Sequence, residues 1–219
     1  MSALNALIAN GGAHIIVDGA GTMFDKFRAH IHKVYALPNL NAAIGVRGNY
    51  NLLQSVFMIA QDFPSQKEML ANLPDRLRYK FKWSSRISQV AYGFDLVIAG
   101  VDNDGEPFAK LLASIDRPDQ PRFTFVDIPY MWSSPDIEES KLRAMGTSFA
   151  ANPDVGAIQL VDNQRKHGDV HVGGFVQIMS VTERGITTRV VKRYPDTIGT
   201  AIDKNSGLDP VRSAGDWRQ

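Results

Sequence analysis

The chain has 219 residues, of which 44% are hydrophobic and 21% charged, and its formal net charge is +1. This composition indicates an ordinary globular protein with a sizeable core, and it gives no electrostatic reason to expect a nucleic-acid or membrane partner. The absence of cysteine excludes disulfides, thiolate nucleophiles and cysteine-ligated metals, and it fits a cytoplasmic location. No apolar run approaches the roughly 20 residues that span a bilayer.

The first part of the chain carries two hairpin patterns. Apolar runs at residues 3–9 and 13–17 flank Asn10-Gly11-Gly12, which is a strong turn signal. A second pair of runs, at 33–37 and 42–46, flanks a turn at 38–41. The first strand therefore begins almost at the N-terminus and should fix that end in a sheet.

Two helices are predicted next. Asn49 is a candidate N-cap for a helix that ends at Pro64, and its apolar residues follow a 3.6-residue period. A second helix follows over residues 66–83. Pro74 lies inside it and predicts a kink or a division into two helices.

The second half alternates in the same way. Strands are predicted at 89–101, 107–115 and 123–128, and Ser134-Pro135 is typical of the start of a helix that ends near Ala151. Residues 154–161 fit either a short helix or an apolar connection. A last hairpin, 175–181 with 186–192, is followed by a polar tail that we expect to be an extended arm.

Groups of strands thus alternate with groups of helices, which favours the α+β class with antiparallel sheets. A four-layer αββα sandwich, with helices on the outer faces of two stacked sheets, satisfies this order. No linker divides the chain, so we predict one domain over residues 1–195 and a polar C-terminal extension over 196–219.

Chemically useful residues stand at the boundaries of the first elements. Asp18-Gly19 ends one strand, Lys33 comes directly before another, and Gly45 lies in a strand that runs to Gly48. Such boundaries are where side chains and free backbone N–H groups converge on ligands. Taken singly, Asp18 is as well explained as a turn residue and Lys33 as a surface charge.

Together these residues resemble the N-terminal-nucleophile (Ntn) hydrolases, specifically the proteasome β-type subunit and the peptidase subunit of the bacterial two-component ATP-dependent protease. The resemblance covers residues 2–193. Asn10-Gly11 matches the family's first turn, Asp18-Gly19 its acid, Lys33 its lysine, and residues 44–48 its glycine segment. Counting back from the acid places Ser2 at the position of the nucleophile.

The resemblance implies hydrolysis of peptide or amide bonds through Ser2, after Met1 has been removed to free the α-amine that serves as base. It implies that Lys33 keeps the local potential positive, that Asp18 orients Lys33, and that the Gly45 N–H stabilises the oxyanion. Asp169 matches the acid that supports the N-terminal amine.

The resemblance also implies a homo-oligomer, either a ring or a dimer, with an ATP-dependent unfoldase as a candidate partner. No cofactor and no metal are expected. The five histidines do not change this, because packed or solvated histidines are the better interpretation without nearby paired acids.

Three departures from the family pattern leave an alternative open. Serine replaces threonine at position 2, Val172 stands where a serine is usual, and Ser133-Ser134 replaces a Ser-Gly pair. The chain could instead be a catalytically silent relative that acts as a self-assembling scaffold or a binding subunit.

Overall fold

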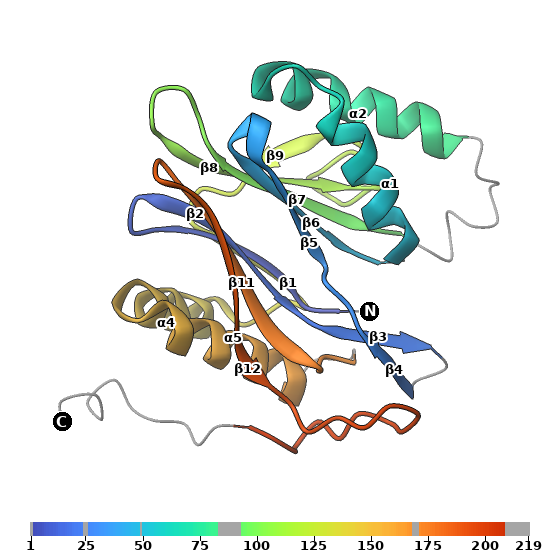
Figure 1. Cartoon of the computed structure of the whole chain (residues 1–219), viewed down its shortest axis with the longest axis vertical. Coiled ribbons are helices and arrows are strands. Elements are labelled where there is room, and N and C mark those ends of the chain that lie inside the picture. Colours follow the sequence, from blue (N-terminus) through green and yellow to red (C-terminus); the bar gives the residue numbers. More distant parts are fainter. Residues whose placement is uncertain (1, 24–25, 49, 83–92, 168–170, 209–219) are drawn as a thin grey trace.

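The computed structural model describes residues 2–23, 26–48, 50–82, 93–167 and 171–208. Two five-stranded antiparallel sheets form its centre (Figure 1). In spatial order, the first contains β10 (Met131–Ser134), β1 (Leu4–Ala9), β2 (Gly12–Asp18), β11 (Phe175–Thr182) and β12 (Gly185–Arg193). The second contains β5 (Val34–Leu37), β6 (Ala42–Arg47), β7 (Asp95–Val101), β8 (Pro107–Ala113) and β9 (Phe125–Asp127).

The remaining elements lie outside these sheets. The hairpin of β3 (Ala20–Met23) and β4 (Lys26–His30) stands at one end, and the short helix η1 (Pro38–Leu40) joins β5 to β6. The helices described are α1 (Tyr50–Gln61), α2 (Gln66–Lys82), α4 (Glu139–Ala151) and α5 (Pro153–His167). The predicted α+β class with antiparallel sheets is therefore confirmed.

Three hydrophobic cores show how these elements pack. One core joins α1 and α2 to the β5–β9 sheet, for example through Leu53 and Ile44. A second draws on both sheets and includes Leu4 and Val97, so the sheets face each other. A third joins α4 and α5 to the β1–β2 sheet, where Leu160 packs near Ile16. In Figure 1 the two helix pairs accordingly lie at opposite ends of the view, with the sheets between them.

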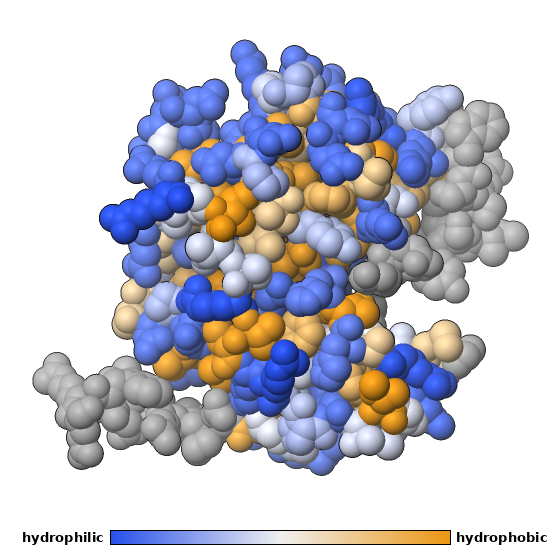
Figure 2. Space-filling model, viewed as in Figure 1, coloured by the Kyte–Doolittle hydropathy of each residue, from blue (hydrophilic) through white to orange (hydrophobic). Residues whose placement is uncertain are grey.

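β2 shows why the central strands read as continuous apolar runs. Ile15 and Val17 belong to the core between the sheets, whereas Ile16 belongs to the core beneath the helices. Both faces of the strand are covered, and all seven residues are buried. The alternation of exposed and buried residues that marks a surface strand is therefore absent. Figure 2 shows hydrophilic side chains gathered over the α2 end of the molecule, away from this core.

The first two hairpins agree with the prediction, and the cause is local. Asn10 and Gly11 have φ angles of 53° and 69°, which is the left-handed geometry that a two-residue hairpin turn requires. Residues Ala9 and Gly12 pair directly on either side of them. The final strand, β12, pairs with β11 as the last predicted hairpin requires, and it lies at a sheet edge.

Three local predictions need correction or completion. Ser134 ends strand β10 instead of capping a helix, because residues 131–134 pair with β1, and α4 begins only at Glu139. Helix α2 runs through Pro74 without division. The undecided stretch at 154–161 belongs to α5, which extends from Pro153 to His167.

The polar tail does not extend away from the fold over its described part. Ala201 forms a bridge with Lys26, and residues 199 and 200 hydrogen-bond to Phe27, so the tail runs back along β4. The predicted N-cap Asn49 lies outside the described residues, as does the first part of the strand expected at 89–101. Within the described residues, no helix has the length and hydrophobicity needed to span a bilayer.

Candidate functional site

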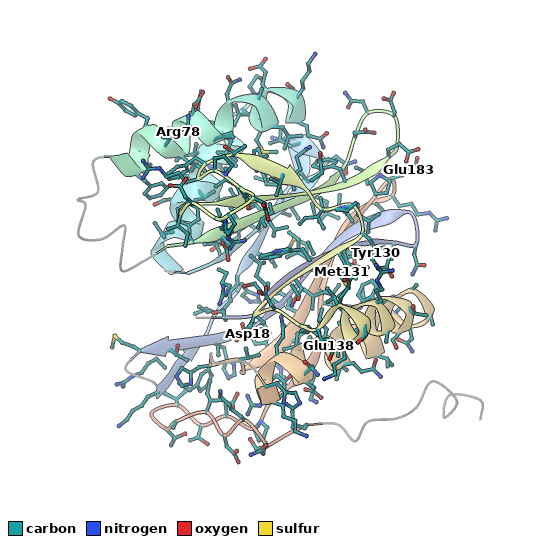
Figure 3. The ribbon with its side chains drawn as sticks, turned by 180° about the vertical axis from the view of Figure 1, so that it is seen from behind. Asp18, Arg78, Tyr130, Met131, Glu138 and Glu183 are labelled. Carbon is teal, nitrogen blue, oxygen red and sulfur yellow. The ribbon has the colours of Figure 1, made fainter. Side chains whose placement is uncertain are left out.

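The candidate site lies where the start of β1, the end of β2 and the residue before β5 meet. Asp18 Oδ1 accepts a hydrogen bond from the Ala3 N–H at 2.9 Å and another from Lys33 Nζ at 2.6 Å. The Asp18 side chain is fully buried and the Lys33 side chain is 5% exposed. The structure thus brings together the acid, the lysine and the N-terminal strand. Figure 3 labels Asp18 within the half of the molecule that contains α4 and α5.

The second carboxylate oxygen of Asp18 is held by the backbone. Oδ2 accepts hydrogen bonds from Ala20 N–H and from Gly173 N–H, each at 3.1 Å. Asp18 therefore receives three backbone donors and one ammonium, which compensates for its burial and fixes its orientation. A carboxylate held in this way can itself hold the lysine at a defined position.

Burial lowers the pKa of Lys33 below its usual 10.5, and the neighbouring Asp18 charge and hydrogen bond oppose that effect. The ammonium form in this buried place thus depends on Asp18. If the carboxylate moved away, the desolvation of Lys33 would no longer be offset and the neutral amine would be favoured.

A small cavity adjoins the ion pair. Its volume is about 20 Å³, which is the space of roughly one water molecule. The lining residues are Ser2, Ile31, Lys33, Val46, Gly48 and Leu53. Ser2 and Lys33 therefore face the same space, and the other side chains around it are aliphatic.

Gly45 lies inside β6, whereas Gly48 follows the last residue of that strand. Gly45 is paired with Val34 on one side and Val97 on the other, and it is not among the cavity-lining residues. Val46 N–H donates to the Lys33 carbonyl, and N–H groups alternate in direction along an antiparallel strand, so the Gly45 N–H points to β7.

Gly48 follows the last residue of β6 and lies beyond the last β5–β6 pair, Val34 with Gly45. Gly48 has a φ of 136° and lines the cavity. The glycine expected to present its N–H to a ligand, Gly45, is thus inside the ladder, and Gly48 occupies the exposed strand end.

Arg47 is a site residue that the sequence analysis missed. Its Nε donates to the Ser2 carbonyl at 2.9 Å, and its Nη1 lies 3.3 Å from Asp95 Oδ2. Asp95 also pairs with Arg117. The only signal in the sequence is a charged residue at the end of an otherwise small and apolar strand.

Arg47 and Asp18 hold the two polar groups of one peptide bond. The Ser2 carbonyl is bound by Arg47, and the Ala3 N–H of the same peptide is bound by Asp18. Because a peptide is planar, these two contacts fix the direction in which the chain leaves Ser2. The backbone of Ser2 is thereby set against the cavity.

The other predicted positions lie around this centre or outside the described residues. Asp169 is outside them, but Gly173, four residues later, binds Asp18 directly. Ser133 and Ser134 are buried in β10, opposite Asn5 and Leu4. Val172 is fully buried in the core beneath the helices.

A serine residue that shares a cavity with a buried lysine and with a glycine at a strand end suits nucleophilic attack on a carbonyl. No cluster of three or more histidine, aspartate or glutamate residues with metal-binding geometry occurs within the part of the chain that the structure describes. No protein-family model matches the sequence, and no curated protein matches it.

Proposed function

We propose that the protein is an Ntn-type hydrolase that cleaves peptide or amide bonds with Ser2 as nucleophile, once Met1 has been removed. The observation that carries the proposal is the immobilised Ser2–Ala3 peptide beside the Asp18–Lys33 pair and the shared cavity. The Ser2–Ala3 peptide is held at both its carbonyl and its N–H group. Such a fixed backbone suits a reaction in which Ser2 itself takes part.

In the proposed reaction, the free α-amine of Ser2 takes the proton of the Ser2 hydroxyl while Oγ attacks the substrate carbonyl carbon. An α-amine has an unperturbed pKa of about 7.7–8.0, which suits a base at neutral pH. The Lys33 ammonium stabilises the alkoxide that forms. The ammonium of Ser2 then protonates the leaving amine, and water hydrolyses the resulting ester.

Gly48 is the better candidate for the oxyanion donor, in place of Gly45. It follows the last residue of β6, where β5 no longer pairs, and it lines the cavity. Loss of one such donor costs roughly 2.7–4 kcal/mol in enzymes where it has been tested. Arg47 contributes by holding the Ser2 carbonyl, which leaves Oγ as the mobile group of that residue.

The arrangement of the cores supports a four-layer αββα sandwich of the Ntn type. Each sheet packs against a helix pair on one side and shares a core with the other sheet on the opposite side. The order of elements along the chain is the one expected for that architecture.

We further propose that the protein works as a homo-oligomer, either a ring or a dimer, and that an ATP-dependent unfoldase is a candidate partner. Multi-angle light scattering of the purified chain tests the first point. A mass of one chain at micromolar concentration would contradict it.

Intact mass combined with covalent labelling tests the activity. We expect the purified protein to lack one methionine and to react at Ser2 with a peptide epoxyketone, which requires both the hydroxyl and the free amine. Retention of Met1 would remove the proposed base and would leave the silent scaffold as the better interpretation. Labelling that persists in Ser2→Ala would also refute the assignment.

The lysine is tested by Lys33→Ala, with Lys110→Ala as its control. Lys110, on β8, forms a partly exposed ion pair with Asp127 of the edge strand β9, so its loss should have no effect on turnover. Lys33→Ala should abolish hydrolysis of fluorogenic peptide amides while the circular dichroism spectrum is retained. Unchanged turnover in Lys33→Ala would exclude the proposed mechanism.

A further inference from the structure

The described part of the C-terminal tail packs against the two segments that supply backbone donors to Asp18 Oδ2. Arg165 on α5 and Asp196 after β12 form a bidentate ion pair, with Nη2–Oδ1 and Nη1–Oδ2 distances of 2.7 and 3.1 Å. Their side chains are 0% and 2% exposed. A pair this deeply buried, far from Ser2 in sequence, has no part in the mechanism described so far.

The Arg165 guanidinium hydrogen-bonds to several groups of the tail. Nη2 also donates to the Asp203 carbonyl at 2.6 Å and to Ser206 Oγ at 3.1 Å, and Nη1 donates to the Val172 carbonyl at 2.8 Å. One side chain thus binds both the tail and the loop that leads to β11. Arginine suits this role because its planar fork serves several acceptors at once.

Asp196 connects this cluster to Asp18 through two adjacent glycines. Its Oδ2 accepts from the Gly174 N–H at 2.7 Å, and the neighbouring Gly173 N–H donates to Asp18 Oδ2. A Cβ on Gly173 would lie 2.3 Å from Asp196 Oδ2 and 2.6 Å from Arg165 Nη1. The glycine therefore lets the ion pair approach the backbone that binds Asp18.

The tail reaches the second donor to Asp18 Oδ2 as well. Thr200 and Gly199 exchange backbone hydrogen bonds with Phe27 of β4, each at 2.8 Å. Ile202 packs with Ala20 and Phe27 in a small separate core. Ala20 is the residue whose N–H binds Asp18 Oδ2. Figure 1 shows this red segment running beside β4.

We infer that residues 196–206 form a strap that positions Asp18, with Arg165 and Asp196 as positioning residues of the candidate site. Both backbone donors to Asp18 Oδ2 lie in segments that the strap binds, Ala20 through Ile202 and Gly173 through Asp196. Through Asp18 the strap determines where the Lys33 ammonium and the Ala3 N–H are held. The inference about catalysis rests on the proposed function, whereas the mechanical link to Asp18 does not.

The test compares Asp196→Asn in the full chain with Asp154→Asn as a matched control. Asp154 also joins α5 to β12, through Arg189, but that pair is exposed and touches neither the strap nor the site. In Asp196→Asn, we expect amide hydrogen exchange at residues 18–21 and 171–175 to accelerate at least about tenfold. We expect kcat on a peptide amide to fall on the order of ten- to a hundred-fold, with KM changed less than about twofold.

The two readouts separate the strap from the proposed activity. Unchanged exchange at these amides would overturn the inference whatever the activity. Faster exchange with unchanged kcat would also overturn it, because the strap would then be structural only. If the wild-type protein hydrolyses nothing, chemical labelling of the Lys33 amine replaces kcat. Labelling should be faster in Asp196→Asn, and an unchanged rate would reject the link to Asp18.

Ile202→Ala covers the case in which Asp196→Asn does not fold. It loosens the strap without leaving a buried arginine unpaired. Here the exchange at residues 18–21 should accelerate more than the exchange at 171–175, since Ile202 contacts Ala20 and Phe27. Equal exchange in wild type and Ile202→Ala would count against the strap.

Discussion

At the scale of single residues, each of the main buried polar groups is held in place by several hydrogen-bond partners. Asp18 accepts from three backbone amides and a lysine, while Arg165 donates to carboxylate, carbonyl and hydroxyl oxygens. Burial of such groups is tolerated because nearly every donor meets an acceptor. The same reasoning applies to His14, whose surroundings give it a measurable effect on stability.

His14 lies on β2 with both ring nitrogens bonded. Nε2 is 3.0 Å from the Ala9 carbonyl and Nδ1 is 2.8 Å from Ser180 Oγ. A carbonyl oxygen only accepts, so Nε2 carries the proton and Nδ1 accepts from the serine hydroxyl in the neutral ring. The ring also contacts Phe149, with centroids 4.9 Å apart. This environment suits the neutral form.

Burial lowers the pKa of His14 below 6.5, with a smaller lowering contribution from Arg189 and an opposing one from the Ala9 carbonyl. As the pH falls below 6.5, the unfolded chain therefore binds a proton that the folded chain does not, and stability is lost until the folded-state pKa is passed. We expect the free energy of unfolding to fall less between about pH 7 and about pH 5 in His14→Gln than in wild type.

Urea titrations at several pH values measure this difference. The comparison uses the change with pH in each protein, so a constant loss of stability in the variant does not affect it. Parallel curves for wild type and His14→Gln over this interval would contradict the assignment of a neutral, buried His14.

At the scale of the elements, the site depends on how closely the two sheets approach at Gly45. A Cβ at this position would lie 2.9 Å from Leu4 Cδ1, 3.1 Å from Ile15 Cγ2 and 3.3 Å from Val34 Cγ1. Leu4 and Ile15 belong to the opposite sheet, and Leu4 is two residues from Ser2. The role of Gly45 is therefore to let β1 lie close to β6.

Gly45→Ala should destabilise the protein by about 1–3 kcal/mol, as overpacked cores do. It should also lower turnover of the folded fraction, because relief of the clash displaces the start of β1. Urea unfolding and kcat of the folded protein measure the two effects.

Gly100→Ala is the control for this prediction. Its Cβ would lie 2.7 Å from the Phe108 ring and 2.9 Å from the Asn41 carbonyl, so it should cost comparable stability. Gly100 pairs with Ala42, at the end of β6 remote from Arg47. Its turnover when folded should be unchanged, and an equal loss of turnover in both variants would contradict the local role of Gly45.

The elements that could be predicted from the sequence are those with local causes. The β1–β2 turn is specified by Asn10 and Gly11, whose φ angles are both positive. Ser134-Pro135 was misleading, because a local helix-start signal was overridden by pairing with β1. The β3–β4 hairpin was not predicted, since part of what stabilises it is the packing of Phe27 and Ile202, which are remote in sequence.

The candidate site divides in the same way. The proximity of Asp18 and Lys33 was expected from a resemblance whose positions follow chain order, and the structure places the two groups in contact. The contacts of Arg47 and of the strap could not be predicted from the local sequence, because the partner is 45 residues away in the first case and 31 in the second. The position of Gly48 beyond the β5–β6 pairing could not be predicted, because it depends on the register of β6 with β5. Composition and spacing do not give that register.

At the scale of the whole molecule, the site exists only while the two sheets are packed together. Ser2 precedes a strand of one sheet, Lys33 and Gly48 flank strands of the other, and the core between the sheets includes residues from both. A core shared in this way couples the unfolding of the two sheets, because neither sheet can unfold without exposing the apolar face of the other to water.

We therefore expect one cooperative transition in urea, and loss of the proposed hydrolysis at the same midpoint. Amide exchange at residues 15–17 of β2 and 96–98 of β7 should report the same free energy of opening, because both segments open only in global unfolding. If β7 exchanged at lower free energy than β2, the sheets would be separate folding units. The residues of the site would then separate before the chain unfolds, and activity would be lost at a lower urea concentration than the signal from β2.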